Sequence, residues 1–256
     1  MSHKHLNQLD SAHPKRIAIV ISNPGVSTTT GWPVGFWWSE LTHPYFYFTE
    51  VGYAVEIFSP GGGECAADSL SDPEDPSQWQ AEDVISRGYK HDPEFVKLLH
   101  TTRPVRDADV ARFDAIIVAG GQAPMFTFET ATDLHAKFVE FYQADKLAAA
   151  LCHGTAVLRW ANFPDGTPLV AGKTVTGFAN IEEDASDQAA REMGALGPDG
   201  HVMAWRVEDE LRSLGANFVH AGLWSGFAVR DGNLLTGQQN FSGTETARLI
   251  IETLGR

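Results

Sequence analysis

Cysteine is scarce in this chain of 256 residues, which contains only Cys65 and Cys152. Two cysteines do not suggest a disulfide framework, and a working thiolate fits the reducing cytosol, so we expect a cytoplasmic protein. Long apolar runs are also absent, and the polar stretch 1–15 has no apolar signal core. We therefore expect no membrane partner and a flexible N-terminal tail over residues 1–15.

Basic residues are the second shortage, because 19 Lys and Arg stand against 33 Asp and Glu, a net charge of −14. This balance opposes binding to a phosphate backbone, so we expect no nucleic acid partner. The remaining composition, 43% hydrophobic and 20% charged, suffices to bury a full core. We expect residues 16–256 to form a single domain.

Short apolar runs alternate with helical patterns along this domain. We predict buried strands at 16–22, 54–59, 115–119 and 147–152, and helices at 132–144 and 155–161. This alternation indicates an α/β fold with a mainly parallel sheet covered by helices on both faces. Near the C-terminus, Asp231-Gly232 predicts a hairpin over 227–236, and Ser242 with Glu245 forms a capping-box pattern that predicts a final helix.

Two stretches do not fit this alternation, and we predict that both are surface insertions able to cover a site. Residues 61–89 are rich in Gly, Asp, Pro and Ser and include Trp79, which predicts a long excursion with little regular structure. Residues 187–214 have a mainly helical, amphipathic pattern, with Trp205 and Leu211 as candidate packing residues.

The strand predicted at 147–152 ends in the sequence Ala150-Leu151-Cys152-His153-Gly154. Small residues around a residue at a strand-to-helix junction are typical of a nucleophile elbow, which exposes its side chain at the carboxyl edge of a sheet. A buried, inert cysteine is the alternative, since free cysteine is often buried. The neighbouring His153 favours the nucleophile.

Paired glycines follow the strand predicted at 115–119, at Gly120-Gly121. Glycine allows backbone N–H groups to point into a cleft, as an oxyanion hole requires, although such a pair is also a common turn. Combined with a cysteine elbow on the next strand, the pattern indicates the N–H groups of Gly121 and His153 as oxyanion donors.

Glu40 follows Trp37 and Trp38, and an aromatic setting raises the pKa of a carboxyl group by desolvation. A protonated Glu40 could donate a hydrogen bond to a thiolate or move a proton to a substrate. The alternatives are an ordinary first-turn glutamate or a pair with His43 at i, i+3. A Glu-x-x-His metal site needs further ligands that the sequence does not identify, so we expect no metal.

An acidic cluster, Glu182-Glu183-Asp184, follows a short strand predicted near 174–178. A carboxylate there could orient His153 as the third member of a Cys-His-acid relay, although acidic clusters also occur at ordinary helix N-termini. Spacing alone does not select among these three residues.

Taken in order, Glu40 with His43-Pro44, Gly120-Gly121, the Cys152-His153-Gly154 elbow, Thr176-Gly177-Phe178 and the run 233–238 resemble the PfpI/ThiJ superfamily of class I glutamine amidotransferase-like proteins. The adjacent Cys-His pair resembles its branch of heat-shock chaperones and glutathione-independent glyoxalases (glyoxalase III). The resemblance implies a flavodoxin-like three-layer sandwich, a homodimer and no organic cofactor.

The same resemblance implies Cys152 as nucleophile, His153 as base, Glu40 as the acid beside the cysteine, and Glu183 as the partner of the histidine. The implied reaction converts a small carbonyl substrate, methylglyoxal, to lactate. One departure concerns the substrate: Gln122-Ala123 stand where the branch has His-Gly after the paired glycines. A tryptophan-rich entrance at positions 32, 37 and 38 also indicates a differently shaped pocket. A stress-related chaperone with Cys152 as an oxidation sensor, or a cysteine hydrolase or amidase, is the alternative.

Overall fold

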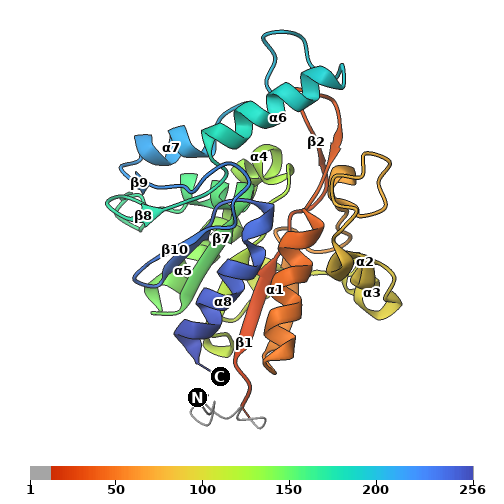
Figure 1. The fold of residues 1–256 in the computed structure, drawn as a ribbon. Coiled ribbons are helices and arrows are strands. Elements are labelled where there is room, and N and C mark those ends of the chain that lie inside the picture. The colour runs from red at the N-terminus through yellow and green to blue at the C-terminus, as the bar shows by residue number, and fades with distance from the viewer. Residues whose placement is uncertain (1–12, 256) are drawn as a thin grey trace, which may run out of the picture.

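A seven-stranded sheet forms the centre of the molecule in the computed structural model, which describes residues 13–255 (Figure 1). The predicted tail therefore lies almost entirely outside the described residues. Every neighbouring pair of strands is parallel except the hairpin at one edge. Across the sheet the strands are β10 (Ala228–Asp231), β11 (Leu234–Gly237), β7 (Leu147–Leu151), β6 (Ala115–Val118), β1 (Arg16–Val20), β4 (Ala54–Ser59) and β5 (Arg103–Pro104).

Two small two-stranded sheets and a set of helices surround this centre. The small sheets pair β2 (Gly25–Val26) with β3 (Pro33–Val34), and β8 (Thr174–Val175) with β9 (Asn217–Phe218). The α-helices are α1 (Trp38–Glu50), α2 (Val84–Lys90), α3 (Pro93–His100), α4 (Pro124–Thr127), α5 (Thr132–Gln143), α6 (Asn180–Glu192), α7 (Val207–Ser213) and α8 (Gly243–Leu254). The 3₁₀ helices are η1 (Ser69–Ser71), η2 (Val105–Asp107), η3 (Val110–Arg112), η4 (Phe128–Thr130), η5 (Cys152–Arg159) and η6 (Asn240–Ser242).

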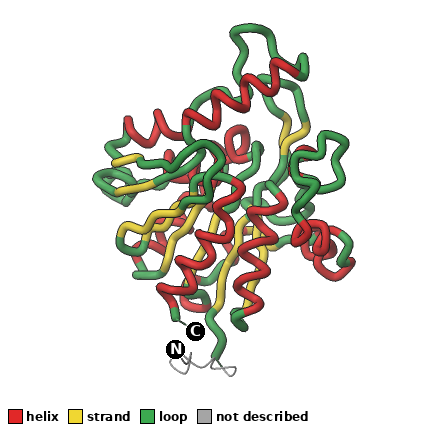
Figure 2. Tube along the Cα trace, in the orientation of Figure 1, coloured by secondary structure: helices red, strands yellow, loops and turns green. Residues whose placement is uncertain are grey.

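The sheet separates two apolar clusters, because successive side chains of a strand point to opposite faces. Ile17 and Ile19 of β1 pack with residues of α1, α3 and α8, whereas Ala18 and Val20 pack with residues of α5, η5 and α7. Figure 2 shows the strands in yellow between red helices. The fold is therefore the flavodoxin-like three-layer α/β sandwich. The central strands β6 and β7 are continuous apolar runs because both of their faces are covered.

Most predicted elements are confirmed, including the four strands and the C-terminal hairpin, whose loop residues are Gly232 and Asn233. The capping box is wrong, although the final helix exists as α8. The hydroxyl of Ser242 accepts hydrogen bonds from the N–H groups of Phe227 and Gln239, at 3.2 and 3.1 Å. Ser242 therefore holds the preceding loop instead of capping α8.

The helix predicted at 155–161 forms as the 3₁₀ helix η5 and begins at Cys152. The Thr155 hydroxyl donates to the carbonyl of Cys152 at 2.6 Å, which competes with the α-helical bond to that oxygen. The mainly helical prediction for 187–214 is wrong for its middle part. Residues 193–206 contain no helix or strand between α6 and α7, since glycines at 194, 197 and 200 interrupt the helical pattern.

The other insertion, predicted over 61–89, agrees with its prediction over 61–83, where η1 is the one helix or strand. The prediction is wrong for 84–89, because α2 begins at Val84, and the side chain of Asp83 caps it by accepting from the N–H of Ser86 at 3.0 Å. Leu211 is fully buried and Trp205 packs beside the same apolar cluster, as predicted. The two insertions meet at the carboxyl edge of the sheet, where their side chains line a common cavity described below.

Candidate active site

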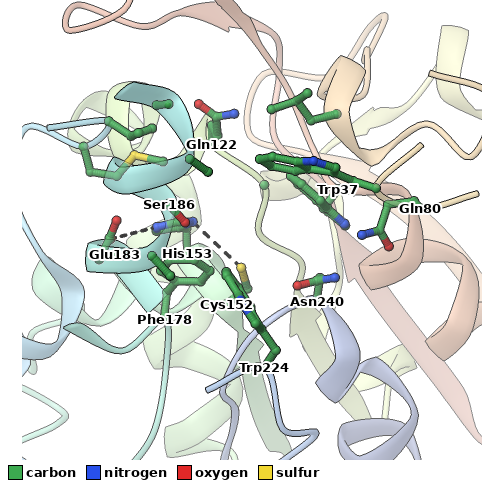
Figure 3. Close-up of a pocket in the computed structure, with 18 of the residues that line it drawn as sticks. Trp37, Gln80, Gln122, Cys152, His153, Phe178, Glu183, Ser186, Trp224 and Asn240 are labelled. Atoms are coloured by element: carbon green, nitrogen blue, oxygen red, sulfur yellow. Dashed lines mark hydrogen bonds and ion pairs between the residues drawn. The ribbon is translucent and has the colours of Figure 1, made fainter. Parts of the chain in front are cut away.

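The candidate site lies at the carboxyl ends of β6 and β7, two adjacent parallel strands (Figure 3). Cys152 follows the last residue of β7, and Gly120-Gly121 lie just after β6. The N-terminus of α1 approaches the same edge, since the N–H of Trp37 donates to the carbonyl of Gly120 at 3.2 Å. Elements that are distant in sequence therefore bring their ends together here, as expected for an open parallel sheet.

The turn at Cys152 is a sharp elbow in which this residue has a φ of 55°, a left-handed conformation that L-residues rarely adopt. Glycine is required both within the elbow, at Gly154, and in the loop after β6 that packs against it, at Gly120. A Cβ on Gly154 would lie 2.5 Å from the carbonyl oxygen of Val118, and one on Gly120 would lie 2.7 Å from the nitrogen of Gly154. The close approach of β6 to the elbow thus depends on two residues that have no side chain.

His153 lies between Cys152 and Glu183. Its Nδ1 is 3.8 Å from the Cys152 sulfur, and its Nε2 is 3.0 Å from Glu183 Oε1 (Figure 3, dashed lines). The ring of Phe178 stacks on the imidazole, with the ring centroids 4.1 Å apart. When Nε2 donates to the carboxylate of Glu183, Nδ1 of a neutral imidazole is an acceptor that faces the thiol.

The acidic cluster resolves into three separate roles along the first turns of α6. Glu183 contacts His153 as described above. Glu182 accepts from the N–H of Ala179 at 3.1 Å and from the side-chain amide of Gln238 at 2.7 Å, and Asp184 pairs with Arg206 at 2.6 Å. Successive residues of a helix point about 100° apart, so only one of the three can face the imidazole.

Glu40 occupies the first turn of α1 and is fully buried. Its Oε2 accepts a hydrogen bond from the N–H of Gly120 at 2.7 Å, and burial raises its pKa to about 8, opposed by its contacts with Cys152 and Gly120. The carboxyl group is therefore protonated at neutral pH, the direction that its aromatic neighbours predict. The alternative pair with His43 is wrong, because His43 Nε2 contacts Asp83 at 2.9 Å.

The Cys152 thiol is also buried, and its pKa lies well above that of an ordinary thiol because of this burial and of the adjacent Glu40. The backbone N–H groups of His153 and Gly121 act in the opposite direction, since they interact with the sulfur. These are the two donors that the sequence indicates for an oxyanion hole. Gly121 has a φ of 101°, and a Cβ there would lie 2.4 Å from the carbonyl oxygen of Gly35.

Asp68 is a buried residue of the site that sequence reasoning missed. Its two carboxylate oxygens accept from the N–H groups of Gly35, at 2.9 Å, and Gln122, at 2.6 Å, which holds the loop that carries Gly121. Burial raises its pKa to about 7. No signal in the sequence marks this residue, since it lies in the irregular excursion, 54 positions from Gln122.

Comparison with known proteins now identifies the lineage, because the sequence pattern of the DJ-1/PfpI family matches residues 35–253. The chain belongs to the DJ-1/PfpI family. Within that family it is 28% identical to the glutathione-independent glyoxalase hsp3101 of Schizosaccharomyces pombe, over 93% of this chain and 95% of the yeast protein.

Two solved structures resemble the chain over 94% of its length. The Rapid Encystment Protein of 24 kDa from Francisella tularensis is 28% identical and aligns over its entire chain with a TM-score of 0.81. Glyoxalase III of Candida albicans is 24% identical and aligns over 97% of its chain with a TM-score of 0.71, a likeness of fold.

A cavity of about 350 Å³ opens onto Cys152, His153 and Gly121. Most of its wall is apolar and aromatic, and it includes Trp32 and Trp37 of the predicted entrance. Trp38 does not belong to this entrance, because it is buried and packs edge-on against Phe36. Other lining residues that the sequence did not single out for the site come from both insertions and from the loops beside β11: Leu70, Trp79, Met193, Met203, Trp224 and Phe241.

Among residues 13–255 no group of three or more His, Cys, Asp or Glu side chains could hold a metal ion. Cys65 and Cys152 are both free thiols. Within the same residues no helix is long and apolar enough to cross a membrane.

Proposed function

We propose that this DJ-1/PfpI protein is a cysteine-dependent, glutathione-independent glyoxalase that converts a 2-oxoaldehyde to a 2-hydroxy acid. One observation carries the proposal: the Cys152 thiol lies between a buried, protonated Glu40 and the His153–Glu183 pair. The reaction requires a nucleophile and groups that move protons between adjacent carbons, and this arrangement supplies both. The relatedness to glyoxalases over nearly the whole chain supports the same reaction.

The first step is attack of the Cys152 sulfur on the aldehyde carbon, C1. Nδ1 of His153 accepts the thiol proton while the S–C1 bond forms and the π pair of the carbonyl moves to oxygen. The N–H groups of Gly121 and His153 stabilise this oxyanion, and Glu183 stabilises the imidazolium. The product of this step is a hemithioacetal on Cys152.

The second step moves a proton from C1 to C2, through an enediol. Glu40, together with His153, is positioned to transfer it, because a carboxyl group with a pKa of about 8 exchanges protons readily near neutral pH. C1 is oxidised to a thioester while C2 is reduced to an alcohol, so no external oxidant is required. Water then cleaves the S–C1 bond, which releases the 2-hydroxy acid and restores the thiol.

The test is lactate formation from methylglyoxal without glutathione or added metal, followed by chirally resolved chromatography. We expect the wild type to form one lactate enantiomer in excess and Cys152→Ala to form only the background product. Equal trace product from both proteins would overturn the glyoxalase proposal. Release of ammonia from an amide substrate by the wild type alone would instead indicate the hydrolase or amidase alternative.

Three further predictions concern the oligomeric state, the location and a second role of the protein. We expect a homodimer, a cytoplasmic location and a stress-related chaperone role. They rest on the family resemblance and on the use of cysteine. The oxidation-sensor variant of the chaperone role has less support, because a sensor thiol needs to be exposed and acidic, whereas Cys152 is 3% exposed with a raised pKa.

A further inference from the structure

The cavity above Cys152 is larger and more apolar than methylglyoxal requires. Its volume of about 350 Å³ lies within the range of about 300–1,000 Å³ that is typical of pockets for drug-sized ligands. Methylglyoxal is a three-carbon molecule whose non-reacting part is a single methyl group. Most of the cavity wall would therefore make no contact with bound methylglyoxal.

Exposed apolar side chains gather at the mouth of this cavity. Trp79, Met193, Trp224 and Phe241 are 46%, 47%, 39% and 49% exposed, and all four line it. They come from four separate segments of the chain, so their convergence is not a consequence of one apolar run. A contiguous exposed apolar surface at the mouth of a pocket is typical of a ligand-binding site.

Unfavourable backbone conformations occur at one of these aromatic residues and directly before another. Trp224 has a φ of 55°, and Gln78, which precedes Trp79, has a φ of 60°. Left-handed conformations of bulky residues cost free energy and concentrate at functional sites. The N–H of Trp224 donates to Glu182 at 3.3 Å, and its ring lies 6.0 Å from Phe178, which stacks on His153. Figure 3 shows Trp224 and Phe178 beside Cys152 and His153.

The wall also contains one donor and one acceptor that have no partner among the described residues. Trp37 and Gln122 line the cavity, and their Nε1 and Oε1 atoms are buried and make no hydrogen bond. Buried polar atoms in native proteins are nearly always bonded, and a ligand with oxygen atoms could bond to these two once their side chains turn toward the cavity. An apolar ligand with a few oxygen atoms fits such a wall.

We propose that the preferred substrate is a 2-oxoaldehyde with a bulky apolar group of about the size of phenyl, bound by Trp79 and Trp224. This inference rests on the proposed function and adds the class of substrate. The aldehyde carbon meets Cys152, and the apolar group extends to the cavity mouth. The reaction keeps the balance given above, so phenylglyoxal and water yield mandelate.

The kinetic test compares phenylglyoxal with methylglyoxal by chromatography of mandelate and lactate. A single methylene in an apolar pocket changes kcat/KM by about tenfold or more, so we expect at least a tenfold preference for phenylglyoxal. Trp224→Ala should reduce that preference to less than about threefold. Cys152→Ala serves as the background control, since phenylglyoxal also reacts with arginine side chains.

Leu223→Ala is the matched control variant. Leu223 adjoins Trp224 and is 43% exposed, yet it does not line the cavity. Its substitution should leave the preference unchanged, which separates contact with the substrate from a general effect of shortening an apolar side chain in this loop. An equal loss of preference in both variants would overturn the role given to Trp224.

The outcomes separate the two proposals. Turnover of methylglyoxal with no preference for phenylglyoxal overturns the substrate class and leaves the glyoxalase function intact. If neither aldehyde is turned over, the proposed function fails, and calorimetry with Cys152→Ala decides the ligand class. Mandelate binding at least tenfold more tightly than lactate would support it, and equal or weaker binding of mandelate would overturn it.

Discussion

At the scale of single residues, the site depends on two acidic groups that share a buried environment. Glu40 raises the pKa of Cys152, whereas the hydrogen bond with Cys152 lowers the pKa of Glu40 against the larger effect of burial, so the two groups are coupled and titrate as a unit. Keeping the proton on Glu40 at neutral pH leaves the carboxyl group available as a donor to sulfur or substrate. In the proposed reaction the nucleophile is therefore generated within the site when His153 accepts the thiol proton, and it does not exist beforehand as an exposed thiolate.

Glu40→Gln should change reactivity and turnover in opposite directions. Above about pH 8, where Glu40 is ionised, its charge raises the pKa of Cys152. Removal of that charge lowers the pKa of Cys152, so iodoacetamide should label Cys152 faster at a given pH in this range. Turnover of 2-oxoaldehydes should fall about 100-fold or more, because a general acid–base group is lost. Labelling rates measured against pH, with Cys65 as the internal reference, check the first part. Slower labelling of Cys152 in the variant would contradict the coupling.

At the scale of secondary structure elements, α6 divides its acidic residues between two tasks. Glu183 contacts the imidazole of His153, the base of the proposed reaction, while Glu182 joins the helix N-terminus to Gln238 and to the backbone of Trp224. The helix therefore connects the proton-transfer group to the cavity mouth.

The pair of variants Glu183→Gln and Glu182→Gln separates these tasks. We expect Glu183→Gln to lower kcat about 10- to 100-fold with a nearly unchanged Tm, because Gln stabilises an imidazolium less well than a carboxylate. Glu182→Gln should lower stability by about 1–3 kcal/mol, since its amide cannot accept all three bonds that the carboxylate accepts. Thermal unfolding and steady-state kinetics on both variants check this. A reversed pattern would contradict the assignment.

The elbow itself offers a second prediction at this scale. Gly154→Ala would place a methyl group 2.5 Å from the carbonyl oxygen of Val118, and a backbone atom of the central sheet cannot move away. We expect a Tm several degrees lower and loss of turnover. Gly166→Ala is the comparison in a turn, because it has a φ of 87° but no atom within 4 Å of the added group. Equal effects of both would mean that crowding at the elbow contributes nothing.

At the scale of the whole molecule, buried carboxyl groups make stability depend on pH. Glu40 changes its pKa from 4.5 to about 8 on folding, and Asp68 from 3.8 to about 7. Between these values the folded state keeps protons that the unfolded state releases, so both groups reduce stability as pH rises from about 5 to 8. The carboxylates of a chain with a net charge of −14 add self-repulsion in the same range.

Urea unfolding at pH 5 and pH 8 measures this effect. The stability of Glu40→Gln relative to wild type should increase with pH, by an amount on the order of a few kcal/mol between pH 5 and 8. Gln retains an oxygen acceptor for the N–H of Gly120, so the variant removes the titration and keeps that bond. The exposed Glu129→Gln should show no such trend. A relative stability of Glu40→Gln that is independent of pH would contradict the raised pKa.

Local sequence alone was sufficient for the frame of this protein. Continuous apolar runs such as β1 and β7, and the hairpin at Asp231-Gly232, are properties of a few adjacent residues, so their structures follow from periodicity and turn chemistry. The elbow at Cys152 and the aromatic setting of Glu40 are local in the same sense. Together they predict where the site lies and that the pKa of Glu40 is raised.

Tertiary structure decided the remainder, because it depends on where distant segments meet. The choice of Glu183 over its neighbours follows from how α6 lies against η5, and Asp68 reaches Gln122 across 54 positions of chain. Ser242 has the local pattern of a helix cap, yet its hydroxyl accepts hydrogen bonds from backbone N–H groups that precede it in the chain. The tryptophans at the cavity mouth come from segments with no periodic pattern. A sequence pattern specifies what a segment can do by itself, whereas contacts between segments are selected by the free energy of the whole fold.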